Sequence, residues 1–199
     1  MVKHPNCGGV LVLGLGCENN NIEVFKKFLN GIDETRIRFL NAQSAGDEIA
    51  EGIRLINELK ETAARDKREP VGINRLKIAL KCGGSDGFSG ITANPLVGRF
   101  CDRLTAMGGS CVLTEVPEMF GAEHLLMQRC ADKSVFDKTV NLINNFKDYF
   151  IRHNQVIYEN PSPGNKEGGI TTLEEKSLGC IQKGGLSEIT DVLDYGDTV

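Results

Sequence analysis

The sequence has few of the features that assign a protein to a membrane or to a nucleic acid. No apolar run approaches the roughly 20 residues that span a bilayer, and the first residues contain no signal-peptide core. The net charge is -4 and the Lys and Arg residues are dispersed, so no basic surface for DNA or RNA is indicated. We therefore expect a cytoplasmic protein with neither a membrane nor a nucleic acid among its partners.

Several catalytic and cofactor motifs are absent as well. The 7 cysteines contain no CxxC pair, which leaves a structural zinc site without support, and we expect them to be reduced. No Gly-Lys-Ser, Gly-Lys-Thr or GxSxG sequence occurs, which argues against a Walker loop and a serine-hydrolase elbow. A dinucleotide fingerprint begins at Gly14 but has Asn19 in its sixth position. Among the 3 histidines, only His124 remains an acid/base candidate.

The sequence does contain an alternation of strand and helix patterns. Four apolar segments are typical of buried strands: residues 9–16, 36–40, 76–80 and 110–114. Helical patterns lie between and after them, over residues 20–31, 44–64, 95–107, 122–130 and 134–153. This order predicts an α/β fold, a Rossmann-like three-layer sandwich in which helices cover both faces of a mainly parallel sheet.

Apolar stripes predict which face of each helix is buried. The stripe of the second helix comprises Ile49, Ile53, Ile56, Leu59 and Ala63, and that of the third comprises Leu96, Val97, Phe100, Cys101 and Leu104. The strand at residues 9–16 is apolar throughout, so we expect it to be covered on both faces.

The last segment differs in composition from the rest. Residues 160–169 are rich in Pro and Gly and predict an irregular loop, after which Thr171 and Glu174 predict the start of a short helix. We therefore divide the chain into a parallel α/β domain, residues 1–155, and a C-terminal extension, residues 156–199, that belongs to a larger domain. The loop of the extension is as consistent with a flexible exit as with a flap over a ligand.

A glycine-rich loop at residues 81–95 is the strongest sign of a ligand site. Its glycines allow the backbone to approach a ligand closely. Asn94 is expected to cap the following helix and Pro95 to lie in its first turn, so that loop N–H groups and the helix N-terminus face an anion. Because ligands of parallel sheets bind beyond the carboxyl ends of the strands, we expect the polar turns at residues 17–21, 41–44 and 115–123 to meet this loop. A tight turn without a ligand is the alternative.

Four motifs, in order along nearly the whole chain, resemble the altronate and galactarate dehydratase family. They are Gly14-Leu15-Gly16-Cys17-Glu18, the loop from Cys82 to Pro95, Thr114-Glu115, and residues 161–177 with their Pro-Ser-Pro-Gly-Asn and Gly-Gly-Ile-Thr-Thr-Leu-Glu-Glu-Lys-Ser sequences. The resemblance implies a hydro-lyase that removes water from a sugar acid to give a 2-keto-3-deoxy acid. It also implies a divalent metal, Fe²⁺ or Mn²⁺.

The resemblance assigns expected roles to residues of this chain. The expected substrate-binding residues are Gly83, Gly84, Ser85, Ser89, Asn94, Asn165 and Lys166. The expected catalytic residues are Asp86, Glu115 and Glu118, and the expected metal contacts are Cys17, Glu18 and Cys82. An elimination needs a base for the proton beside the carboxylate and an acid for the departing hydroxide, and the two glutamates are the candidates.

Family members are implied to extend beyond both ends of this region, so the chain is expected to be an incomplete fragment that is inactive alone. Two alternatives stay open. One is a sister lyase acting on another hydroxy acid such as sulfolactate, and the other is a non-catalytic module that binds an anion or a sugar acid. The sequence also leaves open which acid is bound and whether the protein is a homo-oligomer.

Overall fold

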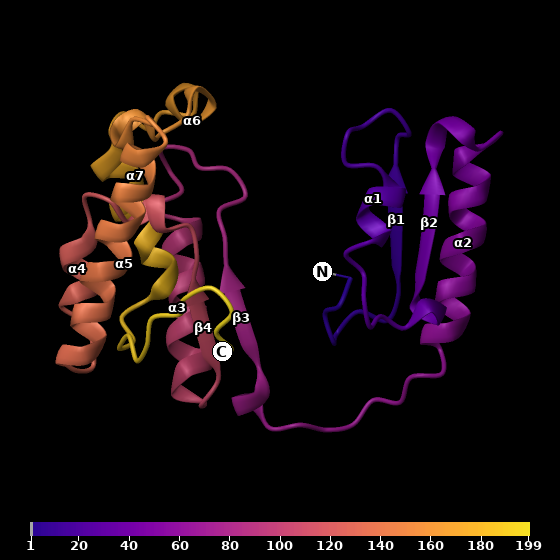
Figure 1. Cartoon of the computed structure of the whole chain (residues 1–199). Coiled ribbons are helices and arrows are strands. Elements are labelled where there is room, and N and C mark those ends of the chain that lie inside the picture. The colour runs from indigo at the N-terminus through magenta and orange to yellow at the C-terminus, as the bar shows by residue number, and fades with distance from the viewer. Residues whose placement is uncertain (1) are drawn as a thin grey trace. The chain divides into compact units, whose positions relative to one another are not determined.

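The computed structural model describes residues 2–199, which divide into two compact units. The residues up to Pro70 form the first unit and Val71–Val199 form the second (Figure 1). Each unit contains its own pair of parallel strands.

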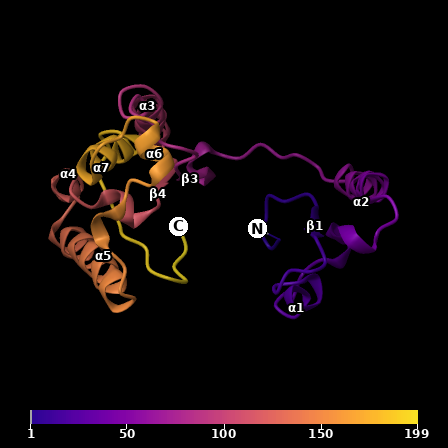
Figure 2. The same ribbon diagram turned by 90° about the horizontal axis from the view of Figure 1, so that it is seen from above.

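The first unit is a strand pair between two helices. Strands β1 (Val10–Gly14) and β2 (Ile37–Asn41) pair in parallel from their first residues to their last. Helices α1 (Ile22–Lys26) and α2 (Glu48–Ala63) lie on opposite sides of the pair (Figure 2). Leu13 in β1 is nonetheless 65% exposed, so the prediction that this strand is covered on both faces is wrong for the unit as described.

Helix α2 begins at Glu48, inside the predicted range of residues 44–64, and its buried face agrees with the predicted one only in part. The Asp47 carboxylate accepts hydrogen bonds from two N–H groups of the first turn, as an N-cap does. The predicted stripe is confirmed at Leu59, which is buried, and wrong at Ile49, Ile53 and Ile56, which are each more than half exposed. Gly52 and Leu55 are the other buried residues of the helix. Gly52 lies against the Leu40 side chain of β2.

The second unit is built on the other strand pair. Strands β3 (Lys77–Leu80) and β4 (Ser110–Leu113) are parallel, and helix α3 (Ala93–Ala106) packs on β4. Helices α4 (Glu123–Met127) and α5 (Lys133–Arg152) follow and pack against each other. The main apolar cluster of the unit comprises Met119, Phe120, Ala122, Leu126, Ile143 and Ile181.

Helix α3 buries only part of its predicted stripe. The prediction is confirmed for Cys101 and Leu104, which are buried, and wrong for Leu96 and Phe100, which are exposed. The helix is turned by Gly98, because the carbonyl group of Gln182 lies where a Gly98 side chain would begin. A small residue, rather than the largest apolar ones, therefore sets the contact face.

The residues after 156 are packed into the second unit and are more regular than predicted. Helix α6 (Pro163–Glu167) replaces the predicted irregular loop, because Ser162 and Asn165 form a capping box at its start. Helix α7 (Leu173–Ile181) packs on the 3₁₀ helix η4 (Val116–Met119), and the 3₁₀ helix η6 (Gln182–Gly184) packs on α3. The remaining 3₁₀ helices are η1 (Glu34–Arg36), η2 (Ala42–Ser44), η3 (Ile73–Arg75) and η5 (Ile157–Glu159).

Two side chains fasten the segment that follows η6. The Arg129 guanidinium donates hydrogen bonds to the carbonyl groups of Gly184 and Ser187. The Asp102 carboxylate accepts hydrogen bonds from the N–H groups of Leu186 and Ser187. These bonds hold α7 and η6 against α3 and β4, which matters for the site described below.

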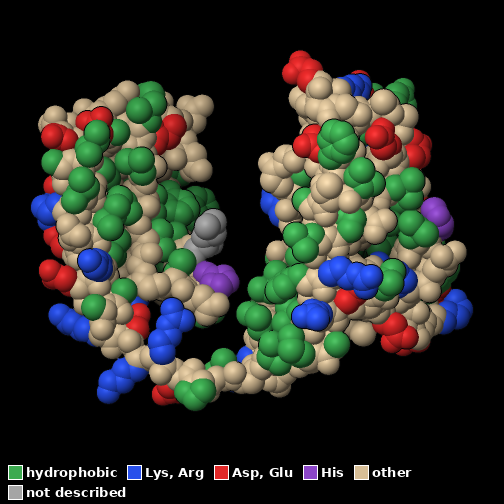
Figure 3. Space-filling view, turned by 180° about the vertical axis from the view of Figure 1, so that it is seen from behind, with side chains coloured by type: hydrophobic (Ala, Val, Ile, Leu, Met, Phe, Trp, Pro, Cys, Tyr) green, Lys and Arg blue, Asp and Glu red, His purple; other side chains and the backbone are tan. Residues whose placement is uncertain are grey.

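The mixed α/β class is confirmed, with parallel strands in both units. A single sheet in a three-layer, Rossmann-like sandwich stays a prediction, because the two strand pairs belong to different units, and the division at residue 155 stays one too. Hydrophobic side chains lie on the surface of both units (Figure 3). Within residues 2–199, none of the helices combines the length and the apolar character needed to cross a bilayer.

Changing Ile143 to Ala is expected to lower the free energy of unfolding of the second unit by about 2–5 kcal/mol. Ile143 is 1% exposed in the main apolar cluster, so the change leaves a cavity. The matched control Leu96→Ala shortens a side chain that is 72% exposed and is expected to cost less than about 0.5 kcal/mol. Urea unfolding followed by circular dichroism measures both. Equal costs for the two variants would contradict the packing of α3.

Candidate active site

Four segments of the second unit meet near the carboxyl ends of β3 and β4. The loop at residues 81–92 follows β3 and η4 follows β4, and because the strands are parallel both segments start at the same edge. The Asn165 amide of α6 donates a hydrogen bond of 3.0 Å to the Ser85 carbonyl group of the loop. Helix α7 packs on η4. This edge therefore collects polar residues from about 100 residues of sequence.

Asp86 holds the glycine loop together from within. Its Oδ1 atom accepts hydrogen bonds of 2.9 Å from the N–H groups of Phe88 and Ser89 and one of 3.0 Å from the Ser89 hydroxyl. The Ser89 hydroxyl and the Phe88 N–H lower the pKa of Asp86. The carboxylate is thus engaged as an anchor of the loop, and a catalytic role for Asp86 and substrate contact by Ser89 stay predictions.

Asn94 does not cap α3, so that prediction is wrong. The helix starts at Ala93 with Thr92 in the cap position, and no side chain caps it. The Asn94 amide instead donates a hydrogen bond of 3.0 Å to the carbonyl group of Gly179 in α7. At this crossing Gly90 leaves room for α7, because an added Cβ would lie 3.0 Å from the Gly179 Cα. Asn94 therefore joins the loop to α7.

Glu115 is held in a conformation that residues with side chains seldom adopt. Its φ of 61° and ψ of 62° are left-handed, which costs of order 1–3 kcal/mol and is typical of functional sites. Its carboxylate accepts hydrogen bonds from the Cys82 N–H at 2.7 Å and from Lys81 at 3.0 Å. Burial raises the pKa of Glu115, but these hydrogen bonds and the charge of Lys183 outweigh burial and place the pKa below its ordinary value. Glu115 is therefore a carboxylate at neutral pH.

Glu118 lies between two buried lysines. Its Oε1 atom is 3.3 Å from the Lys176 ammonium, and its Oε2 atom is 3.3 Å from the Lys183 ammonium. Lys183 also lies 3.8 Å from Glu115 Oε2, and Lys81 pairs with Glu115 from the surface. Three ammonium groups against two carboxylates leave the cluster with a formal charge of +1. Such a cluster favours an additional anion.

Donor groups of the glycine loop border this cluster. In the described part of the chain, the backbone N–H groups of Gly83, Gly84 and Ser85 donate no hydrogen bond. The Cys82 thiol lies 2.9 Å from the Ser85 hydroxyl.

A second thiol, Cys180 of α7, also borders the cluster. Burial and a hydrogen bond with Glu118 raise the pKa of the Cys180 thiol to about 12, so this thiol stays protonated. The arrangement combines N–H donors of the loop that have no hydrogen-bond partner in the described residues, a formal charge of +1 and the ionised Glu115 carboxylate.

The predicted site residues not yet placed fall into three sets, since Gly83, Gly84, Asp86 and Ser89 belong to the glycine loop and Asn94 to the start of α3. Those that the structure brings together with the lysines are Cys82, Ser85, Glu115, Glu118 and Asn165. Lys166 is exposed on α6 and does not line the cluster. Cys17 and Glu18 belong to the first unit, where the Glu18 carboxylate accepts a hydrogen bond of 2.5 Å from the Gly16 N–H and Gln43 donates one of 3.7 Å to the Cys17 sulfur.

Donor groups for a divalent metal do not converge in either unit. Among residues 2–199, no three His, Cys, Asp or Glu side chains are placed to hold a metal ion. Glu115 and Glu118 are already paired with ammonium groups, which occupy the places that a cation would take. The described residues do not fit a metal centre, and Fe²⁺ or Mn²⁺ at Cys17, Glu18 and Cys82 stays a prediction.

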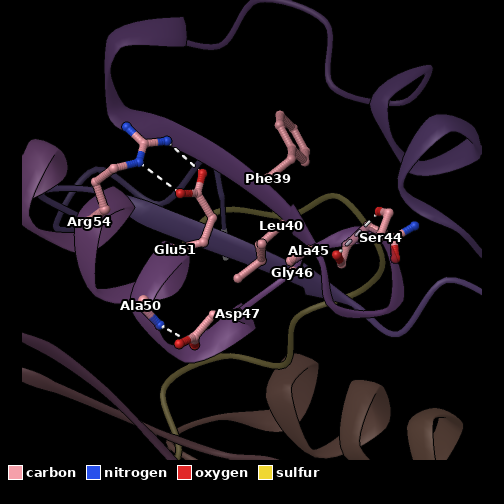
Figure 4. Close-up of a pocket in the computed structure, with 10 residues that line it drawn as sticks. Phe39, Leu40, Ser44, Ala45, Gly46, Asp47, Ala50, Glu51 and Arg54 are labelled. Atoms are coloured by element: carbon pink, nitrogen blue, oxygen red, sulfur yellow. Dashed lines mark hydrogen bonds and ion pairs between the residues drawn. The ribbon is translucent and has the colours of Figure 1, made fainter.

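A hollow of about 520 Å³ lies elsewhere, in the first unit between the end of β2 and the start of α2 (Figure 4). Its lining includes Asp47, which caps α2, and Arg54, which pairs with Glu51 at 2.5 Å. Asn41 and Ser44 of the predicted polar turn line it, but none of the residues predicted as catalytic, substrate-binding or metal-contacting does. We therefore place the candidate site at the lysine cluster of the second unit, where the chemistry-bearing groups are.

The sequence prediction missed Lys176, Lys183 and Asn160. A signal for the two lysines was present, because Lys176, Cys180 and Lys183 are spaced by four and three residues and so share one face of the α7–η6 segment. A lysine on the inner face of a helix needs a buried acceptor for its ammonium group. Asn160 offered no such signal, because it lies in a Pro-rich turn of no regular period.

Both units match models of known domains. Residues 73–199 match the C-terminal domain of D-galactarate/altronate dehydratase, and residues 1–64 match the second domain of D-galactarate dehydratase/altronate hydrolase.

Three curated relatives extend this likeness over nearly the whole chain. The altronate dehydratase of Bacillus subtilis is 63% identical over 198 residues, which are 100% of this chain and 40% of the relative. The altronate dehydratase of Escherichia coli is 59% identical over 99% of this chain and 40% of its own length. The galactarate dehydratase (L-threo-forming) of Escherichia coli is 35% identical over 97% of this chain and 39% of its own length. The chain thus spans about 40% of the length of these relatives.

Changing Glu115 to Gln is expected to alter how the stability of the second unit depends on pH. The pKa of Glu115 is lower in the folded protein than its ordinary value, so its carboxylate stabilises the fold above about pH 4.3 and that contribution is lost as the pH falls through the folded pKa. Urea unfolding between about pH 3 and pH 7 should show a difference between wild type and variant that is largest near neutral pH and shrinks in acid. Glu167→Gln, in exposed α6, is the matched control and should show no such trend.

Proposed function

The chain belongs to the D-galactarate/altronate dehydratase family, and we propose that it supplies the site at which a sugar acid loses water to give a 2-keto-3-deoxy acid. The observation that carries the proposal is the lysine cluster beside the glycine loop, with its net positive charge. The substrate of such a reaction is a carboxylate, which is the kind of ligand that this cluster favours. The 63% and 59% identities to altronate dehydratases, against 35% to a galactarate dehydratase, favour altronate as the acid.

The chemistry requires the removal of a weakly acidic proton. The proton on C2, beside the carboxylate, leaves first, and the negative charge spreads onto the carboxylate as an enediolate. The bond from C3 to its hydroxyl then breaks, a second group protonates the departing hydroxide, and the enol that remains becomes the 2-keto product. Positive charge and fixed N–H donors stabilise the enediolate more than they stabilise the substrate, which lowers the barrier.

Residues of this chain suit two of these tasks. The N–H groups of Gly83, Gly84 and Ser85 are free to receive the substrate carboxylate, which is the role predicted for them. Glu115 is the candidate base, because its carboxylate is ionised at neutral pH and lies at the start of the donor loop, where the Cys82 N–H binds it. Its lowered pKa makes it a weaker base than an ordinary glutamate. Glu118 is more deeply buried and pairs with two lysines, which suits it to holding them in place.

A non-catalytic module that binds sugar acids is the alternative of a different class. It would use the same donors and charges but would have no need of Glu115 in its uncommon backbone conformation. A sister lyase for another hydroxy acid would share the whole mechanism and differ only in the contacts to the rest of the substrate. A dehydratase turns over its substrate and a non-catalytic module does not. Comparing turnover of several hydroxy acids distinguishes the dehydratase from a sister lyase.

The complete gene product is expected to convert altronate to a 2-keto-3-deoxy acid. The assay is formation of the keto acid, followed with semicarbazide, with galactarate and sulfolactate tested in parallel. Because the identity to altronate dehydratases is the higher, kcat/KM is expected to be greatest for altronate. Binding of altronate without any keto acid from any of the three would support the non-catalytic module instead.

Glu115→Gln in the complete gene product is expected to lower kcat by about 10²–10⁴-fold, because the amide cannot accept the C2 proton. KM is expected to change much less, since the N–H donors and lysines remain. The matched control Glu167→Gln removes an exposed carboxylate of α6 and should leave kcat unchanged. A Glu115→Gln variant with wild-type kcat would rule out this residue as the base.

A further inference from the structure

The two buried lysines differ in how fully their ammonium groups are hydrogen-bonded. Lys176 has three oxygen neighbours, which are Asn160 Oδ1 at 2.8 Å, Asn165 Oδ1 at 3.0 Å and Glu118 Oε1 at 3.3 Å. An ammonium group has three N–H donors, so these neighbours take all of them. Lys176 therefore has no donor left for a ligand.

Lys183 is in the opposite situation. It donates one hydrogen bond, of 3.3 Å, to Glu118. The other neighbouring acceptor, Glu115 Oε2, lies 3.8 Å away and already accepts the Cys82 N–H at 2.7 Å. The Lys183 side chain is only 7% exposed, so water does not readily replace the missing partners. A buried ammonium group with unused donors is costly unless a ligand completes its hydrogen bonds.

The charges point to an anion as that ligand. Glu118 is the one carboxylate within 3.3 Å of both Lys176 and Lys183, so the most buried part of the cluster holds one negative and two positive charges. The Glu115 carboxylate neutralises this excess positive charge only in part, because it is already bound by the Cys82 N–H and by Lys81. A bound carboxylate next to Lys183 would supply the missing negative charge, and the Cys82 contact places the start of the donor loop beside it.

We propose that Lys183 is the ammonium group that contacts a carboxylate or enediolate oxygen of the bound acid, and that Lys176 is a positioning residue. Lys176 acts through others: it orients Glu118, which in turn orients Lys183, and it holds Asn165, whose amide binds the Ser85 carbonyl group of the loop. This division of roles rests on the proposed function, because it concerns the same site and the same class of ligand, an α-hydroxy acid.

Lys81 is the third ammonium group of the cluster, and its exposure sets it apart. Its side chain is 73% exposed, so its effect on a bound anion is screened by salt. The contact from buried Lys183 is screened much less. Binding that depends on Lys183 is therefore expected to persist in about 0.5 M NaCl, where the effect of a surface lysine fades.

The test measures binding and stability separately in the complete gene product. The variants are Lys183→Met, Lys183→Gln and Lys176→Met, and the matched control is Lys133→Met, which removes a lysine that is 85% exposed at the start of α5 in the same unit. Calorimetric titration with altronate and with galactarate, at low and high salt, gives the affinity, and thermal unfolding gives the stability.

Loss of Lys183 is expected to weaken binding of the acid by about 10- to 100-fold at both salt concentrations, the effect of one buried charge-assisted hydrogen bond. Thermal stability is expected to stay near that of wild type, because Glu118 keeps Lys176 as a partner. Lys176→Met is expected to lower the unfolding temperature, because Asn160 and Asn165 lose the donor that joins them. Lys133→Met is expected to change neither property.

Wild-type affinity in both Lys183 variants would overturn the proposal. So would unfolding of both, since it would make Lys183 a structural residue, and so would a failure of the wild-type protein to bind either acid. If the wild-type protein binds the acid but forms no keto acid, the proposed function fails while the assignment of Lys183 is still decided by the binding data.

Discussion

The site depends on the burial of two ammonium groups against one carboxylate. Moving a charge from water into a protein interior costs several kcal/mol unless partners replace the lost hydration. Glu118 supplies charge to both Lys176 and Lys183, and two asparagines complete the shell of Lys176. Much of the second unit is arranged around this requirement, because these partners come from η4, α6, α7 and the turn before α6.

The same requirement links the fold to a chemical property. A cluster with complete partners would be a structural feature and nothing more. Here the partners are complete around Lys176 and incomplete around Lys183, and the incomplete side borders the glycine loop with its free N–H groups. Glu115 lies between Lys183 and the glycine loop, where its backbone conformation is strained and its carboxylate is ionised. An anionic ligand would satisfy the donors, balance the charge and lie beside a base.

Local signals in the sequence predicted much of the secondary structure. The apolar period over residues 44–64 predicted α2, which begins within that range at Glu48 after the Asp47 N-cap. The parallel strands were predicted from their apolar runs within a few residues of their ends. The inner face of α3 was predicted correctly at Cys101 and Leu104 and wrongly at Leu96 and Phe100, because Gly98 turns the helix and lets the Gln182 carbonyl group approach it closely. In α2 the prediction was right at Leu59 and wrong at the three isoleucines. An apolar stripe identifies a face that could be buried, and close packing decides which one is.

The sequence by itself determined the α/β class and the family, because these follow from short motifs and from the period of apolar residues. It also placed Cys82, Ser85, Glu115, Glu118 and Asn165 among the candidates, through motifs that resemble a known family. Only the tertiary structure decided that Lys176 and Lys183 belong to the same site. Their partners lie 11 to 68 residues away in sequence, and such distant contacts form only when η4, α6 and α7 pack together. That packing decides how many acceptors surround each ammonium group. It therefore decides whether a lysine has an N–H donor left for a ligand.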